Sequence, residues 1–315
     1  MEDEWQLLML IFERLDAKSL QVAACVCRRW SEAAMKDELW KNLCLSKWPS
    51  LAEETGLLAV QAAGKYHKFY SLRSQARLFL THSHKLKPLN PRLLMEDLIF
   101  FLDITHKEST VFSFTRGGEF FHPIYFSGED STFCFKLPLQ ELSFKSCLWK
   151  SSPQTSPTIR ATVPACSQKW SKNEMKELNV SWAVMVKGSS KILQLLDAQG
   201  SGHVMGSICN YADTLPAHFC CTLAGSSNEI AEVDLFFRLS HSVADDEVPE
   251  MSLTLCPMVV GDEDLNKSKC FELNELRLSI MNTSSWRYLT LTQALHYFQL
   301  AFLHNAHFKS FKPTS

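Results

Sequence analysis

Apolar side chains recur with helical spacing in the first fifty residues, and this feature constrains the fold most. Leu8, Ile11, Phe12 and Leu15 lie at i, i+3, i+4 and i+7, which places them on one face of an α-helix. Neither Gly nor Pro interrupts the stretch. The spacing predicts a helix over residues 5–14.

Three more short helical segments are expected directly after the first. Asp16 is suited to cap a second helix, because its carboxylate can accept hydrogen bonds from the free amides of the next turn, and Asp37 can cap the last one. A small helical bundle is therefore predicted. Its apolar residues would be Leu20, Val22, Ala23 and Ala24 in the second segment, Val26, Trp30, Ala33 and Ala34 in the third, and Leu39, Trp40, Leu43 and Leu45 in the last.

The first helix carries more apolar surface than one stripe requires. Leu7 and Leu10 lie away from the Leu8 stripe, so a second surface is needed to cover them. That surface can belong to the rest of this chain or to another protein. Periodicity alone does not separate the two alternatives.

Residue types at fixed offsets point to the second alternative. Residues 7–20, 25–30 and 38–44 resemble the F-box in order and spacing. The resemblance implies a three-helix unit that docks on a Skp-type adaptor and so joins a cullin-based ubiquitin ligase, while the rest of the chain selects a protein substrate. It implies that the following residues face the adaptor or form the motif core: Leu8, Ile11, Phe12, Leu15, Leu20, Val26, Cys27 and Trp30.

The opening of the motif departs from the family pattern. F-boxes usually begin with Leu-Pro, whereas this chain has Glu4 and Trp5 at the matching positions. Proline pre-sets the first helical turn, and in the family it also packs on the adaptor. The departure therefore bears on the affinity for the adaptor more than on the identity of the motif.

Length and composition predict an ordered second part. A chain of 315 residues favours about two domains, and a hydrophobic content of 46% with 21 Phe and 8 Trp supplies a core for both. We expect an F-box over residues 1–48, a helical linker over 49–92 and a β-rich substrate-recognition domain over 93–315. The linker would hold one helix with Leu57, Leu58, Val60 and Ala63 and another over residues 66–80.

From about residue 95 the pattern changes to short apolar runs rich in β-branched and aromatic residues, separated by turn signals. The predicted fold class is α+β, with a mainly antiparallel β sandwich or barrel and a closing helix over residues 289–308. The candidate strands are residues 97–104, 110–114, 120–125, 132–137, 180–187, 191–196, 203–209, 219–223, 230–239, 251–260 and 271–281.

Charge and motifs exclude several functions. A net charge of −2 and a pI near 6.6 argue against a nucleic-acid or acidic-membrane partner, which would select a basic face. No signal-peptide pattern and no run of about 18 apolar residues is found, so we expect the nucleus, the cytoplasm or both. No catalytic motif emerges, and an enzyme is not expected.

The cysteines favour free thiols over a metal centre. The chain has 11 Cys without a Cys-x-x-Cys pair. His218, Cys220 and Cys221 suggest a metal site at first sight, but a second ligand pair at the required spacing is missing. We therefore expect neither a metal nor a cofactor.

The resemblance extends beyond the F-box. Residues 97–103 with 111–113, and later 178–184, look like a group of plant F-box proteins whose C-terminal region lacks a common repeat. This implies a plant origin and a non-catalytic substrate-recognition subunit of a Skp-cullin-F-box ligase. The alternative is a ligand- or glycan-binding β domain that acts as a sensor fused to an F-box.

Overall fold

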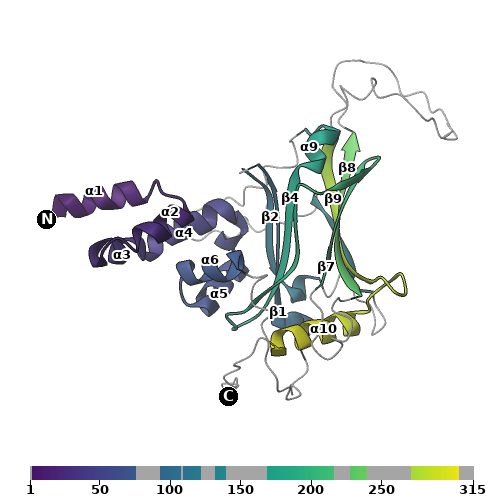
Figure 1. The fold of residues 1–315 in the computed structure, drawn as a ribbon. Coiled ribbons are helices and arrows are strands. Elements are labelled where there is room, and N and C mark those ends of the chain that lie inside the picture. Colours follow the sequence, from purple (N-terminus) through teal and green to yellow (C-terminus); the bar gives the residue numbers. More distant parts are fainter. Residues whose placement is uncertain are drawn as a thin grey trace, which may run out of the picture.

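The computed structural model describes residues 2–75, 93–107, 109–121, 132–139, 169–215, 228–239 and 271–304. Figure 1 shows three layers: N-terminal helices, a first sheet against them, and a second sheet behind the first. The C-terminal helix lies across one end of the two sheets. This is the α+β arrangement predicted from the sequence, with two antiparallel sheets and a closing helix.

The helical layer contains every helix predicted for residues 1–80. Its elements are α1 (Glu2–Phe12), α2 (Ala17–Ala23), α3 (Arg28–Ala34), α4 (Asp37–Lys47), the 3-10 turn η1 (Pro49–Ala52), α5 (Glu54–Ala63) and α6 (Tyr66–Ser74). Asp16 caps α2 as predicted, since its Oδ1 accepts a hydrogen bond from the Ser19 amide at 2.7 Å. The predicted helix over residues 66–80 ends at Ser74, and residues 76–80 lie outside the described residues.

The predicted cap at Asp37 is wrong. Lys36 occupies the cap position of α4 without a side-chain hydrogen bond, and Asp37 is already the first helical residue. Its Oδ1 accepts instead from the amide of Tyr66 at 2.9 Å. The carboxylate therefore joins α4 to the start of α6, a role that is not encoded in the local sequence.

The first sheet has the strand order β2-β1-β4-β5 and is antiparallel throughout. Its strands are β1 (Leu98–His106), β2 (Ser109–Gly117), β4 (Leu178–Val186) and β5 (Ile192–Gln199). The 3-10 turns η2 (Met95–Asp97) and η3 (Gly118–Phe120) flank β1 and β2, and the short helix α9 (Lys172–Lys176) precedes β4.

The second sheet has the order β10-β9-β8-β7-β6, and β3 pairs with β9 outside this path. Its strands are β3 (Cys134–Pro138), β6 (His203–Met205), β7 (Ile208–Thr214), β8 (Glu229–Leu239), β9 (Phe271–Asn282) and β10 (Arg287–Tyr288). The closing helix is α10 (Leu291–His304). Among the helices that the structure describes, none is both long and apolar enough to cross a membrane.

Some strand predictions differ from the structure. The stretch 203–209 is a hairpin, because Gly206 at φ 63° turns the chain between β6 and β7. The predicted strand at 120–125 begins in η3, and its remainder from residue 122, like 219–223 and 251–260, lies outside the described residues. The short β10 was not predicted.

Strand β1 belongs to two apolar cores. Its inward side chains, such as Phe100 and Leu102, pack in the core between the two sheets and α10. Its outward side chains Ile99 and Phe101 pack with the N-terminal helices. A strand covered on both faces needs a continuous apolar run rather than an alternating one, and residues 98–102 provide it.

Candidate adaptor-binding face and the polar junction behind it

One stripe of α1 holds the helical bundle together. Phe12 is 1% exposed, and Leu8 and Leu20 are also buried. The Phe12 ring meets the ring of Trp30 edge to face, with centroids 5.4 Å apart. Among the eight residues carried over from the F-box, Leu8, Phe12 and Leu20 therefore form bundle core rather than an outer surface, and Leu15 is half-buried.

The opposite stripe of α1 is apolar and open to solvent. Leu7 and Leu10 are exposed, Leu10 by 61%, and Ile11 lies with them at the i, i+3, i+4 spacing of one helix face. The sequence placed Ile11 on the Leu8 stripe, but the structure exposes it by 49%. The surplus apolar surface of α1 is thus not covered by the described part of this chain.

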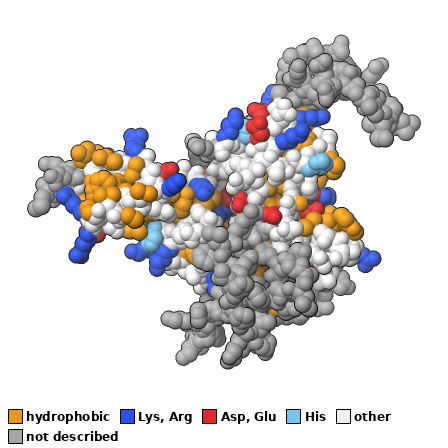
Figure 2. Space-filling model, viewed as in Figure 1, with side chains coloured by type: hydrophobic (Ala, Val, Ile, Leu, Met, Phe, Trp, Pro, Cys, Tyr) orange, Lys and Arg blue, Asp and Glu red, His pale blue; other side chains and the backbone are white. Residues whose placement is uncertain are grey.

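The next two helical segments add to this surface. Val22 in α2 and Val26 just before α3 are each more than 60% exposed, Trp30 is at 36%, and Cys27 is exposed. Figure 2 shows apolar side chains gathered over this N-terminal end of the molecule. We call the set of Leu7, Leu10, Ile11, Val22, Val26 and Trp30 the apolar face. Exposed apolar side chains gathered in one region of a molecule are typical of protein-binding surfaces.

Trp5 occupies the position where the family has proline. It is half-buried and packs on the core of the helical layer, while Lys36 Nζ lies 5.9 Å from its ring centroid. Trp5 therefore contributes apolar contact at the start of α1, although it does not fix the backbone as proline would.

Hydrogen bonds fix the helices to the first sheet behind the apolar face. The Ser50 hydroxyl in η1 lies 2.7 Å from the hydroxyls of both Ser113 and Thr115 on β2. The Thr110 hydroxyl donates to the backbone carbonyl of Lys47 at 3.1 Å. An ion pair between Arg116 on β2 and Glu53 lies in the same region.

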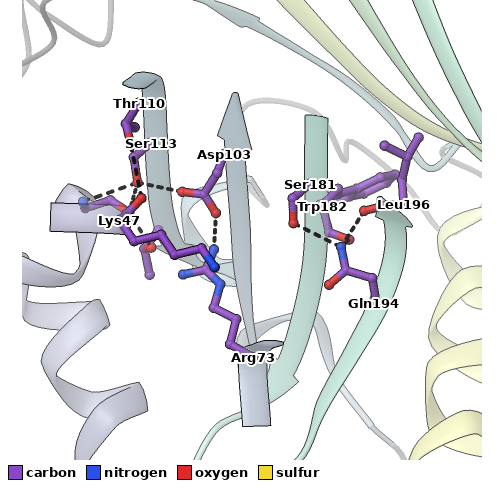
Figure 3. A network of polar contacts seen from close by, with 11 residues as sticks. Lys47, Arg73, Asp103, Thr110, Ser113, Ser181, Trp182, Gln194 and Leu196 are labelled. Carbon is purple, nitrogen blue, oxygen red and sulfur yellow. Dashed lines mark hydrogen bonds and ion pairs between the residues drawn. The ribbon is translucent and has the colours of Figure 1, made fainter. Parts of the chain in front are cut away.

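A buried ion pair lies at the centre of this junction (Figure 3). Arg73 of α6 donates to Asp103 of β1, and both side chains are 3% exposed. The Arg73 guanidinium lies 4.5 Å from the ring centroids of Trp48 and Phe101, and Asp103 also accepts from the Ser113 hydroxyl at 2.7 Å. Burial raises the pKa of Asp103, an effect that Arg73 and Ser113 counter in part.

A pocket of about 290 Å³ opens beside the ion pair. Its walls come from both layers: Lys47, Trp48, Arg73 and Ser74 from the helices, Asp103 and Thr105 from β1, Asn179, Val180 and Ser181 from β4, and Gln194, Asp197 and Gln199 from β5. This junction was not predicted from the sequence. Its signal was the polar residues at alternate positions of otherwise apolar strands, such as Asp103 in β1 and Ser181 in β4.

Other features of the sequence lead to no site here. The described residues contain no group of three or more His, Cys, Asp or Glu that could hold a metal ion. His218, Cys220 and Cys221 lie outside the described residues.

Comparisons with known proteins match the N-terminal helices of this chain to F-box proteins. An F-box-like family model matches residues 6–46, which cover α1 to α4 almost completely. F-box protein At5g39250 of Arabidopsis thaliana is 34% identical over 108 residues, which are 34% of this chain and 39% of that protein. F-box protein SNE of the same plant is 42% identical over 73 residues, which are 22% of this chain and 45% of that protein.

The relatives are matched only in part. A third one, the probable F-box protein At5g04010 of Arabidopsis thaliana, is 28% identical over 34% of this chain and 37% of its own length. The matched region thus spans less than half the length of each of these relatives, and no solved structure matches the chain. The chain carries an F-box-like domain near its N-terminus and is homologous to several F-box proteins of Arabidopsis.

Proposed function

We propose that this protein is the substrate-recognition subunit of a Skp-cullin-F-box ubiquitin ligase. The observation that carries the proposal is the apolar face, which lies within the F-box-like residues 6–46 and is left open by the described part of the chain. A Skp-type adaptor would bury this face and connect the chain to a cullin. The β-rich part would hold a protein substrate whose identity the sequence and fold do not specify.

The junction behind the apolar face supports this role. A ligase must hold its substrate at a set distance from the ubiquitin that is transferred, and proximity is then the catalytic contribution. The Arg73–Asp103 ion pair and the Ser50 hydroxyl contacts fix the helices on the sheet, as a flexible tether would not. In this proposal the chain performs no chemistry of its own and works in the nucleus, the cytoplasm or both.

The test needs variants that change the surface without unfolding the bundle. Leu8 and Phe12 are buried, so a charge there would unfold the chain whether or not an adaptor binds. Leu10→Asp and Val26→Asp introduce a charge on exposed positions instead. Gln61→Asp, on the exposed side of α5, makes the same charge change outside the apolar face and is the matched control.

Binding of the full chain to a purified plant Skp-type adaptor is measured by biolayer interferometry. A charge left unpaired in a dry interface costs about 3–5 kcal/mol, so Leu10→Asp and Val26→Asp are each expected to weaken binding by more than about a hundredfold. Gln61→Asp should bind like the wild type. Unchanged affinity in both variants of the apolar face would refute the proposal.

A further inference from the structure

The outer face of the first sheet is divided into an apolar part and a polar part. Ile99, Phe101, Ala183, Met185 and Ile192 form the apolar part, which the helices cover. Farther along the same strands, the outward positions become polar, as at Asn179 and Ser181 of β4 and at Asp197 and Gln199 of β5. These polar positions line the pocket. Asn179, Ser181 and Asp197 are half-buried and Gln199 is exposed, so the helices leave this end of the face open to a ligand.

The pocket wall carries two cations, Lys47 and Arg73, and two carboxylates, Asp103 and Asp197. Arg73 is paired with Asp103, but its Nη1 is buried and has no hydrogen-bond partner among the residues that the structure describes. A buried donor without a partner costs free energy, which a shift of the guanidinium toward an acceptor in the pocket would recover.

Lys47 is the second cation of the pocket and lies at its exposed rim. Within the described residues it makes no ion pair, and its Nζ is held 5.0 Å from the Trp48 ring centroid and 5.1 Å from that of Tyr70. Desolvation and then the nearby charge of Arg73 lower the pKa of Lys47, although Asp103 and Asp197 act in the opposite direction. An anionic group beside Lys47 would act in the same direction as the two aspartates and raise the pKa of Lys47.

The remaining walls offer one further carboxylate, Asp197, which can accept from hydroxyl, amino or amide donors of a ligand, and several neutral hydrogen-bonding groups. Gln194 is held rigidly, because its Nε2 donates to the Ser181 hydroxyl at 3.0 Å and to the carbonyls of Trp182 and Leu196 (Figure 3). Asn179, Ser181 and Gln199 add amide and hydroxyl groups, and Trp48 supplies an aromatic wall. A volume of about 290 Å³ is at the lower end for small-molecule sites.

We propose that this pocket binds a small carboxylate whose skeleton carries hydroxyl, amino or amide groups. The carboxylate would lie near Lys47 and Arg73, and the polar skeleton would face Asn179, Ser181 and Gln199. Since the walls come from α4, α6 and three strands, the ligand would join the helical layer to the sheet. Ligand binding here does not depend on the proposed function, because the apolar face is formed by other residues.

The experiment uses the full chain and four defined probes. L-Malate and L-glutamate are the carboxylates, erythritol is the neutral polyol of similar size, and inorganic phosphate is the plain anion. Unfolding is followed by differential scanning fluorimetry at about 10 mM of each probe. At least one carboxylate is expected to raise the Tm by about 3 °C or more, because a ligand that binds only the folded state stabilises it. Erythritol and phosphate should change the Tm by less.

A matched pair of variants locates the site. Lys47→Met keeps an unbranched stem on the Trp48 ring but removes the charge, whereas Lys41→Met makes the same change at an exposed position of α4 outside the pocket. In calorimetric titrations, Lys47→Met should weaken carboxylate binding at least about tenfold, and Lys41→Met should leave it unchanged.

Three results would overturn this inference: no Tm rise with either carboxylate, an equal rise with phosphate or erythritol, or equal affinity in Lys47→Met and Lys41→Met. Adaptor binding is measured in the same variants. Because neither lysine belongs to the apolar face, a loss of carboxylate binding with retained adaptor binding separates this inference from the proposed function.

Discussion

Breaking the Arg73–Asp103 ion pair tests how the helices are fixed to the sheet. Arg73→Met keeps an apolar stem between the rings of Trp48 and Phe101 but leaves Asp103 with a single side-chain partner in the described residues, the Ser113 hydroxyl. Because both members of the pair are 3% exposed, the Asp103 carboxylate would remain buried without an ion-pair partner, and the charge of Lys47, which also lowers its pKa, would be its remaining counter-charge. Loss of one partner from a buried pair costs about 3–5 kcal/mol of the free energy of unfolding.

The double variant Arg73→Met/Asp103→Leu separates charge from packing. It removes both ions, and the Ser113 hydroxyl keeps its contact with Ser50 at 2.7 Å. Replacement of a buried ion pair by apolar residues is often neutral or stabilising, so the double variant should regain most of the stability that Arg73→Met loses.

Urea denaturation of the full chain, followed by tryptophan fluorescence, measures this difference. Trp48 is a suitable reporter, since the Arg73 guanidinium lies 4.5 Å from its ring centroid. A loss below about 1 kcal/mol in Arg73→Met would show that the pair is screened by water, contrary to its burial. A double variant less stable than Arg73→Met would refute the reasoning on the unpaired charge.

Three further perturbations have defined outcomes. Iodoacetamide should modify the exposed Cys27 and spare Cys44, because burial raises the pKa of Cys44 to about 12 and thiolate is the reactive form. Peptide mapping checks which thiol is modified, and bound adaptor should protect Cys27. Asp16→Ala should lower the Tm at neutral pH. Hydrogen bonds from Ser19 hold the pKa of Asp16 below its ordinary value of 3.8, so the difference in Tm between Asp16→Ala and the wild type should disappear as the pH falls through the folded-state pKa. Gly56→Ala should lower the Tm by several degrees in a thermal melt, because a Cβ there would lie 2.5 Å from the Leu51 Cα. An unchanged Tm would mean that α5 moves freely relative to η1.

Local patterns in the sequence predicted most of the elements. The apolar spacing of residues 8–15 and the Asp16 cap depend on neighbours within one or two turns, and the structure reproduces both α1 and the cap of α2. Ile11 was placed on the wrong stripe because it lies about 40° around the helix from Leu7 and about 60° from Leu8. Tertiary packing decides such a borderline position, and it exposes Ile11.

The junction could not be predicted, because its partners are distant in the chain. Asp37 was read as a cap, but it bonds the amide of Tyr66, 29 positions later. Arg73 and Asp103 are 30 positions apart, and nothing local to either residue indicates the other. The three-part division at residues 48 and 92 stays a prediction.

The double burial of β1 has a consequence for genetic work on this protein. One way to obtain a fragment without the apolar face is to delete the F-box-like residues 6–46. In this chain Phe101 is covered by Phe69 and Arg73 of α6, which lie outside the F-box-like residues 6–46. A deletion that continued through α6 would expose Ile99, Phe101 and Met185 as one contiguous apolar strip, and such a fragment is expected to aggregate. Point substitutions on the apolar face, such as Leu10→Asp, would remove the proposed adaptor contact and leave the packing of α6 on the sheet unchanged.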